Sequence, residues 1–190
     1  MIRRADQCLL IATLIPLCWL SMMAVHEGGH YLCARLTNGV VTSVVLHPLA
    51  ISRTDVMPNP QPLIVCWGGP VFGCVAPLVA WGICRVTLLR FAFLARFFAG
   101  FCLIANGAYI GFGSFEGIGD AGELLRLGSS PLLLWVFGLL TIPTGFLVWH
   151  GAGADFGFGP QAKAVDPGAA RLSAILLIAI VVLELLFGHV

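Results

Sequence analysis

Charged side chains are scarce in this chain of 190 residues. Only 10% of the residues are Asp, Glu, Lys or Arg, and ten basic against nine acidic residues leave a net charge of +1. The charges form no run of one sign, so the sequence gives no sign of an acidic tail or of a basic surface for nucleic acid. We therefore expect no nucleic acid among its partners.

The seven cysteines lack the spacing of a thiolate metal site. No two of them form a CxxC pair, and they are scattered through the apolar segments at positions 8, 18, 33, 66, 74, 84 and 102. We interpret them as small buried hydrophobic side chains rather than as disulfides or metal ligands.

Apolar residues, by contrast, are abundant. They make up 59% of the chain, and the mean hydropathy is +0.98. A typical soluble domain is about 25% charged, more than twice the charged fraction found here. The composition therefore predicts a multi-pass integral membrane protein, embedded in a lipid bilayer and folded as a single domain over residues 1–190.

Five apolar stretches have roughly the 20-residue length that a helix needs to cross a bilayer. They cover residues 8–36, 63–86, 88–111, 131–150 and 170–187. Between the first two, residues 40–46 are mostly β-branched, and prolines follow at positions 48, 58, 60 and 62. We predict an all-α polytopic membrane protein with about five transmembrane helices and a short β-strand or hairpin between helices 1 and 2.

The predicted strand must avoid lipid, because unpaired backbone groups are not tolerated in the hydrocarbon layer. We therefore expect it at the membrane interface or sheltered among the helices. Its free edge can pair with an extended peptide by strand addition. A purely structural hairpin is an equally good interpretation.

The first apolar stretch contains the HExxH motif His26-Glu27-Gly28-Gly29-His30. Positions i and i+4 share a helix face, so the two histidines can direct their nitrogens at one zinc ion, with Glu27 beside it as general base. From 5 His and 4 Glu in the chain, such a match is expected by chance only about 0.003 times. The alternative is a polar patch satisfied by other helices.

The motif lies late in its predicted helix. At 1.5 Å per residue, a helix starting at Leu9 reaches His26 after about 25 Å of a hydrocarbon layer that is roughly 30 Å thick. The site is therefore expected near the far edge of the membrane. We expect Gly28 and Gly29 to permit the close approach of another helix or of a substrate backbone.

A catalytic zinc ion takes three protein ligands and keeps one position for water. The best candidate for the third ligand is Asp120, because the glycines of segment 117–122 loosen the backbone after the third span. The competing candidates are Glu116, Glu123, Asp155 and His150. Alternatively, Asp120 serves only as the N-cap of a helix over residues 121–127.

These parts and their order resemble the site-2 protease family of intramembrane zinc metalloproteases. The HExxH helix is followed by a β-rich segment, by a second helix with a Gly68-Gly69-Pro70 turn, and by a Gly119-Asp120 element after the third helix. The resemblance covers residues 8–127, which form the catalytic core that it implies, with two additional helices at 131–150 and 170–187.

The resemblance implies roles for single residues. His26, His30 and Asp120 would bind one zinc ion, and Glu27 would be the catalytic base. Substrate contacts would fall to Gly68, Gly69, Pro70 and Asn106. The family usually shows an Asn-Pro-rich run that leads to Asp-Gly, whereas here Asn106 lies far upstream and Asp120 is followed by Ala121.

The implied activity is a zinc-dependent metalloendopeptidase. It would hydrolyse a peptide bond in or near the transmembrane segment of a single-pass membrane protein, in the plasma membrane of a prokaryote, as a step of regulated intramembrane proteolysis. No PDZ or CBS module is inserted between the spans, so the resemblance implies control by partners or by prior cleavage of the substrate.

Two other functions compete with the protease. A non-catalytic zinc-binding membrane adaptor would carry the same ligands. A metal-ion transporter would need further polar residues along several spans, and the fourth and fifth spans offer almost none.

Overall fold

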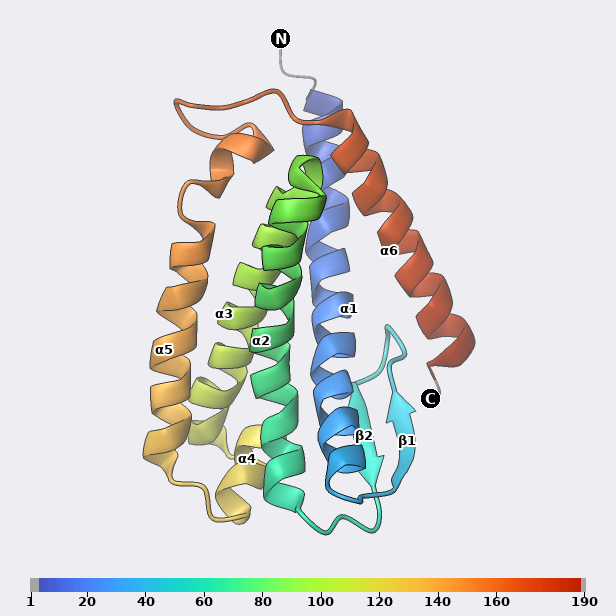
Figure 1. The fold of residues 1–190 in the computed structure, drawn as a ribbon, viewed down its shortest axis with the longest axis vertical. Coiled ribbons are helices and arrows are strands. Elements are labelled where there is room, and N and C mark those ends of the chain that lie inside the picture. Colours follow the sequence, from blue (N-terminus) through green and yellow to red (C-terminus); the bar gives the residue numbers. More distant parts are fainter. Residues whose placement is uncertain (1–3, 189–190) are drawn as a thin grey trace.

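The structure, a computed structural model, describes residues 4–188. Within this range, five helices are long and apolar enough to cross a membrane (Figure 1). They are α1 (Arg4–Leu36), α2 (Pro62–Thr87), α3 (Ala92–Glu116), α5 (Pro131–Trp149) and α6 (Pro167–Phe187). The predicted fold class is confirmed, including the small sheet between α1 and α2.

The third span deviates most from its predicted limits of 88–111. A 3-10 turn, η1 (Leu89–Phe91), precedes α3, and α3 continues to Glu116 before Gly117 ends it in the left-handed region at φ 64°. A helix ends where its backbone conformation changes, and not where its apolar residues end. The short helices α4 (Gly119–Arg126) and η2 (Ala152–Phe156) complete the fold.

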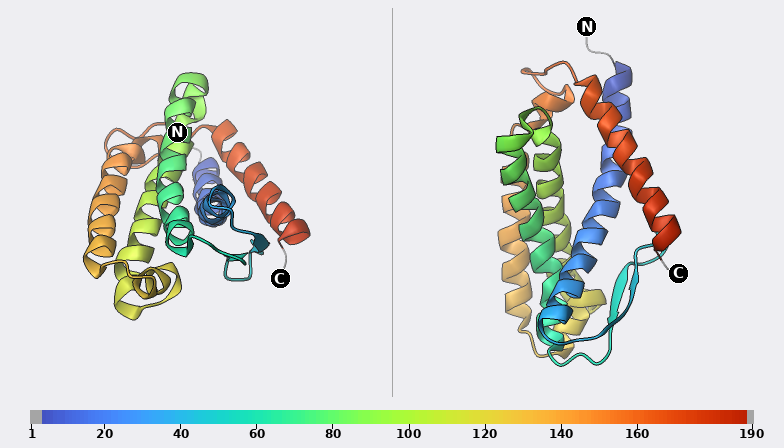
Figure 2. Two further views of the ribbon diagram at one scale, coloured as in Figure 1. Left: turned by 60° about the horizontal axis from the view of Figure 1, so that its bottom comes forward. Right: turned by 45° about the vertical axis from the view of Figure 1, so that its right-hand side comes forward.

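The sheet is a hairpin of β1 (Val41–Val45) and β2 (Arg53–Val56). The two strands are antiparallel, with Val44 opposite Thr54. Figure 2 shows the hairpin along the C-terminal part of α1, with the end of α6 close to the hairpin loop. A Cβ atom added to Gly188 would lie 2.9 Å from the backbone nitrogen of His47 in that loop.

Two hydrophobic clusters hold the helices together. The first lies near the N-terminal half of α1, where Leu10, Leu14 and Cys18 pack with residues of α3, η2 and α6. The second joins α2, α3, α4 and α5 through Cys66, Ile110, Ala121, Leu124 and Leu134.

All seven cysteines are free, but only four are buried: Cys18, Cys66, Cys74 and Cys102. The prediction of small buried hydrophobic side chains therefore holds for these four. Cys8 is exposed, and Cys33 and Cys84 are half-buried.

Many large apolar side chains of the outer helices are exposed. Leu139 and Leu140 on α5 and Ile178 on α6 are all more than 60% exposed. A soluble monomer rarely exposes apolar patches as extensive as these helix faces, whereas a bilayer is their natural solvent. Together with the lengths of the five helices, this identifies a multi-pass membrane protein.

Candidate metal centre

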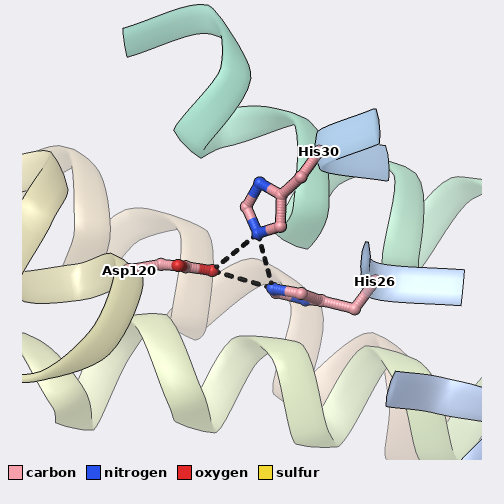
Figure 3. A group of neighbouring side chains, drawn as sticks. All are labelled: His26, His30 and Asp120. Atoms are coloured by element: carbon pink, nitrogen blue, oxygen red, sulfur yellow. Dashed lines mark hydrogen bonds and ion pairs between the residues drawn. The ribbon is translucent and has the colours of Figure 1, made fainter. Parts of the chain in front are cut away.

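Three side chains from two distant parts of the chain converge on one point (Figure 3). The Nε2 atoms of His26 and His30 lie 2.7 Å and 3.1 Å from Oδ2 of Asp120. The two Nε2 atoms lie 3.1 Å from each other. Both histidines are buried, and Asp120 is half-buried. The three ligand atoms therefore form a compact triangle below the protein surface.

Helix α1 supplies both histidines from one face, as the i, i+4 spacing predicts. The two rings meet edge to face, with centroids 4.8 Å apart and an interplanar angle of 75°. Helix α1 is continuous through Gly28 and Gly29. The expected close approach is found at Gly29, where an added Cβ would lie 2.7 Å from Cβ of Phe72 in α2. A Cβ added at Gly28 would meet no neighbouring atom within 4 Å among the residues that the structure describes.

The predicted Gly68-Gly69-Pro70 turn does not exist. All three residues lie inside the continuous helix α2 and are buried. Neighbouring helices shelter the backbone groups that proline and glycine leave free, so these residues need not end a helix in a membrane. A Cβ on Gly69 would lie 2.7 Å from Nε2 of His26 and would also collide with the ring of His30. The glycines therefore let α2 approach the histidine pair.

Asp120 reaches the histidines through a sharp reversal between α3 and α4. Gly117 and Gly119 both adopt positive φ angles, of 64° and 54°, which glycine adopts with little strain. The backbone nitrogen of Asp120 donates to the hydroxyl of Tyr109, at 3.1 Å. The ring of Tyr109 in turn packs edge-on against His26, with centroids 5.8 Å apart. Tyr109 thus connects the turn between α3 and α4 to the face of α1 that carries the two histidines.

Asp120 is not the N-cap of the helix that follows. Helix α4 begins at Gly119, with Ile118 at the N-cap position, so Asp120 lies within the first turn. Burial raises the pKa of the Asp120 carboxyl, but a proton shared with the adjacent Nε2 atoms of His26 and His30 outweighs burial and holds that pKa well below its usual value. Asp120 is therefore an ionised carboxylate.

The other acidic and histidine candidates lie elsewhere. Glu123 lines the same cavity, but its Oε2 pairs with Nη2 of Arg126 at 2.7 Å. Asp155 pairs with Lys163 in the segment that joins α5 to α6. Glu116 and His150 are exposed at the ends of α3 and α5. Of the candidates weighed from the sequence, Asp120 is the one that the fold brings to the histidine pair.

Hydrogen bonds on the far side of each ring fix the histidine tautomers. Nδ1 of His30 lies 2.8 Å from the carbonyl oxygen of Val65, which only accepts, so this nitrogen carries a hydrogen. Nδ1 of His26 lies 2.7 Å from Oδ1 of Asn106, whose Nδ2 donates to the carbonyl of Cys102. The amide oxygen therefore faces His26. In their neutral forms, both rings direct an Nε2 lone pair toward Asp120.

The centre thus gathers three acceptor atoms at 2.7–3.1 Å from one another. Such atoms repel unless a proton or a metal cation lies between them. A tetrahedral zinc ion, with ligand bonds of about 2.0–2.1 Å, would hold neighbouring ligand atoms about 3.3 Å apart, so the atoms need to separate by only about 0.2–0.6 Å. Two imidazoles and one carboxylate are a donor set that suits zinc.

No protein-family model, curated protein or solved structure matches the chain.

A cavity of about 1130 Å³ opens beside the three residues. Ligand pockets typically measure about 300–1,000 Å³, so this cavity can admit a peptide segment. Its walls come from α1, α2, α3, α4 and the hairpin, and they include Trp19, Met22 and Met23. Glu27, which is only 4% exposed, also lines the cavity. The three candidate metal ligands and the expected base therefore line the same cavity.

Two contacts of the site have no clear signal in the sequence. Asn106, expected to touch substrate, is 1% exposed and bonded to His26. A lone amide in an apolar span needs a buried hydrogen-bond partner, but the sequence does not indicate that this partner is His26. The second contact is a hydrogen bond of 2.7 Å from Oγ1 of Thr54, in β2, to Oε2 of Glu27.

Proposed function

We propose that the chain is an intramembrane zinc metalloprotease of the site-2 protease type. It hydrolyses a peptide bond in or near a membrane-spanning segment of another membrane protein. The observation that carries the proposal is the convergence of two Nε2 lone pairs and an ionised carboxylate beside a glutamate, all lining one cavity among membrane helices.

His26, His30 and Asp120 would hold one zinc ion. When bound, the ion would lower the pKa of a coordinated water toward neutrality and polarise the scissile carbonyl. Asn106 and the Val65 carbonyl keep the histidine rings in the tautomer and orientation that ligation requires.

Glu27 moves the proton. It follows His26 directly and faces the same cavity. Its carboxylate accepts a proton from the attacking water and later donates that proton to the leaving amine. Burial excludes most of the bulk water from Glu27, so the proton is transferred within the cavity.

The substrate is a single-pass membrane protein. Apolar walls such as Trp19, Met22 and Met23 suit the side chains of a membrane segment. A helical segment hides its carbonyls in internal hydrogen bonds, so it must unwind locally before cleavage. The hairpin beside the cavity can hold the unwound segment by strand addition.

The cellular setting follows from the same proposal. The protein acts in the plasma membrane of a prokaryote, as a step of regulated intramembrane proteolysis. Five membrane-crossing helices support the bilayer setting. Control by partner proteins or by a preceding cut in the substrate limits which membrane proteins reach the cavity.

The test compares the wild type with Glu27→Gln in liposomes. The probes are single-pass model proteins whose membrane segment carries either a central Asn-Gly pair or Leu-Leu. We expect the wild type to cut the Asn-Gly probe faster, and Glu27→Gln to retain zinc while losing cleavage. Zinc flux across the liposome membrane that is unaffected by Glu27→Gln would instead indicate a transporter. Bound zinc without any cleavage would indicate an adaptor.

A further inference from the structure

We propose that Thr54 of the hairpin is a positioning residue for the catalytic base. Its hydroxyl holds the carboxylate of Glu27 in one orientation, so that docking of the hairpin on α1 sets the rate of the chemical step. The inference rests on the proposed protease function, because only there does Glu27 carry a proton between water and amine.

The hydrogen bond between the two residues is short and directed at the carboxylate. Oγ1 of Thr54 lies 2.7 Å from Oε2 of Glu27 and 3.4 Å from the Glu27 carbonyl oxygen. A hydroxyl has one hydrogen, and a charged acceptor at 2.7 Å binds it more strongly than a neutral one at 3.4 Å. Thr54 therefore donates to the side chain of Glu27.

Glu27 has few other restraints on its carboxylate. Its side chain is almost fully buried, and Thr54 is the one hydrogen-bond donor to this carboxylate among residues 4–188. The bond engages Oε2 and leaves Oε1 available to a water in the cavity. A base held in this way needs no reorientation before it accepts a proton, and misplacement by about 1 Å can cost a reaction about 100-fold.

The position of Thr54 depends on the whole hairpin. Thr54 stands opposite Val44 in the ladder, and it is half-buried, whereas its neighbours Arg53 and Asp55 are exposed. The hydroxyl of Ser43 donates to Asp55 at 2.6 Å and ties the two strands together on the outer side. The strand pairing thus turns the Thr54 hydroxyl toward α1.

The experiment uses the full-length, zinc-loaded protein in liposomes with the Asn-Gly probe. The variants are Thr54→Val, which removes the hydroxyl but keeps the shape, and Thr54→Ser, which keeps the hydroxyl. The matched control is Thr87→Val, at an exposed threonine whose hydroxyl donates to the Ile83 carbonyl at the far end of α2, away from the cavity. The readouts are kcat, KM and the zinc dissociation constant.

We expect Thr54→Val to lower kcat about 10- to 100-fold, with KM unchanged and the zinc dissociation constant within about twofold of the wild type. Thr54→Ser should recover most of the lost kcat, and Thr87→Val should behave as the wild type.

Three results would overturn the inference while leaving the protease function intact: wild-type kcat in Thr54→Val, equal losses in the Val and Ser variants, or a loss of zinc in Thr54→Val. A wild type that binds zinc and cuts neither probe would instead remove the proposed function, and this inference with it.

Discussion

Nδ1 of His26 donates a hydrogen bond of 2.7 Å to Oδ1 of Asn106, on the side of the ring that faces away from Asp120. The partner of a ligating histidine fixes its tautomer and raises its basicity. Asn106 lies 80 positions from His26 and on a different helix, so α3 controls the ligand geometry of α1.

The first prediction concerns this pair. Replacing Asn106 by Ala should weaken zinc binding by about 10- to 100-fold, because the His26 ring loses the acceptor that holds its orientation. The dissociation constant can be measured by competition with a zinc indicator. The control is Asn38→Gly, which removes an exposed amide from a left-handed position after α1 and should leave zinc binding unchanged. Wild-type affinity in Asn106→Ala would contradict the positioning role.

The second prediction separates the two acids of the cavity. Asp120→Asn keeps the size of the side chain but removes its charge, and we expect zinc affinity to fall by at least about 100-fold, since a ligand is lost and not merely a supporting contact. Glu123→Gln, at a carboxylate already paired with Arg126, should leave the affinity near that of the wild type. The opposite order of the two variants would show that Glu123 is the third ligand.

The third prediction concerns the contact between α2 and the histidines. In Gly69→Ala the new methyl group would meet both rings, so we expect about 1–3 kcal/mol of destabilisation together with loss of zinc. Gly82→Ala is the matched control on the same helix, because no described atom lies within 4 Å of its added Cβ. Melting temperature in detergent and zinc content after purification are the measurements. Equal behaviour of the two variants would argue against close packing at Gly69.

The fourth prediction is a pH dependence far from the metal centre. Hydrogen bonds from Arg90 lower the pKa of Asp166, at the start of α6, from 3.8 to about 2. A carboxyl whose pKa is lower in the folded state stabilises the protein above about pH 4, and this contribution is lost as the pH falls toward 2.

The comparison of wild type with Asp166→Asn tests this directly. Asn still caps the helix, so the substitution isolates the charge. We expect the wild type to melt at a higher temperature than the variant at pH 6, and the difference to shrink steadily between pH 4 and pH 2. A difference that stays constant over this range would show that the ion pair with Arg90 contributes nothing.

Much of the fold could be predicted from the sequence, because a helix that crosses a bilayer needs apolar side chains along its whole length. Each span can therefore be recognised from its own residues, without knowledge of its tertiary contacts. The proximity of Asp120 to the histidines was also predictable, since the surrounding glycines mark the place where the chain turns back. The end of α3 and the start of α4 were not, because the positive φ angles of Gly117 and Gly119 set these limits through backbone conformation.

The contacts that complete the site were beyond the sequence. Strand β2 reads Arg53-Thr54-Asp55-Val56. Its first three residues are all polar, so no alternation of polar and apolar residues reveals which of them faces α1. Gly68-Gly69-Pro70 indicates a turn in water, yet packing against α1 keeps it helical. In both cases the local structure depends on a contact with a distant part of the chain, and no local sequence pattern predicts that contact.

If each of the five candidate spans among the described residues crosses the membrane once, positions 4 and 188 lie in opposite compartments. Gly188 adjoins the hairpin loop at Leu46 and His47, and the hairpin borders the metal cavity. A topology reporter fused behind position 188 would therefore report the side of the membrane nearer to the hairpin loop, whichever way the chain is inserted.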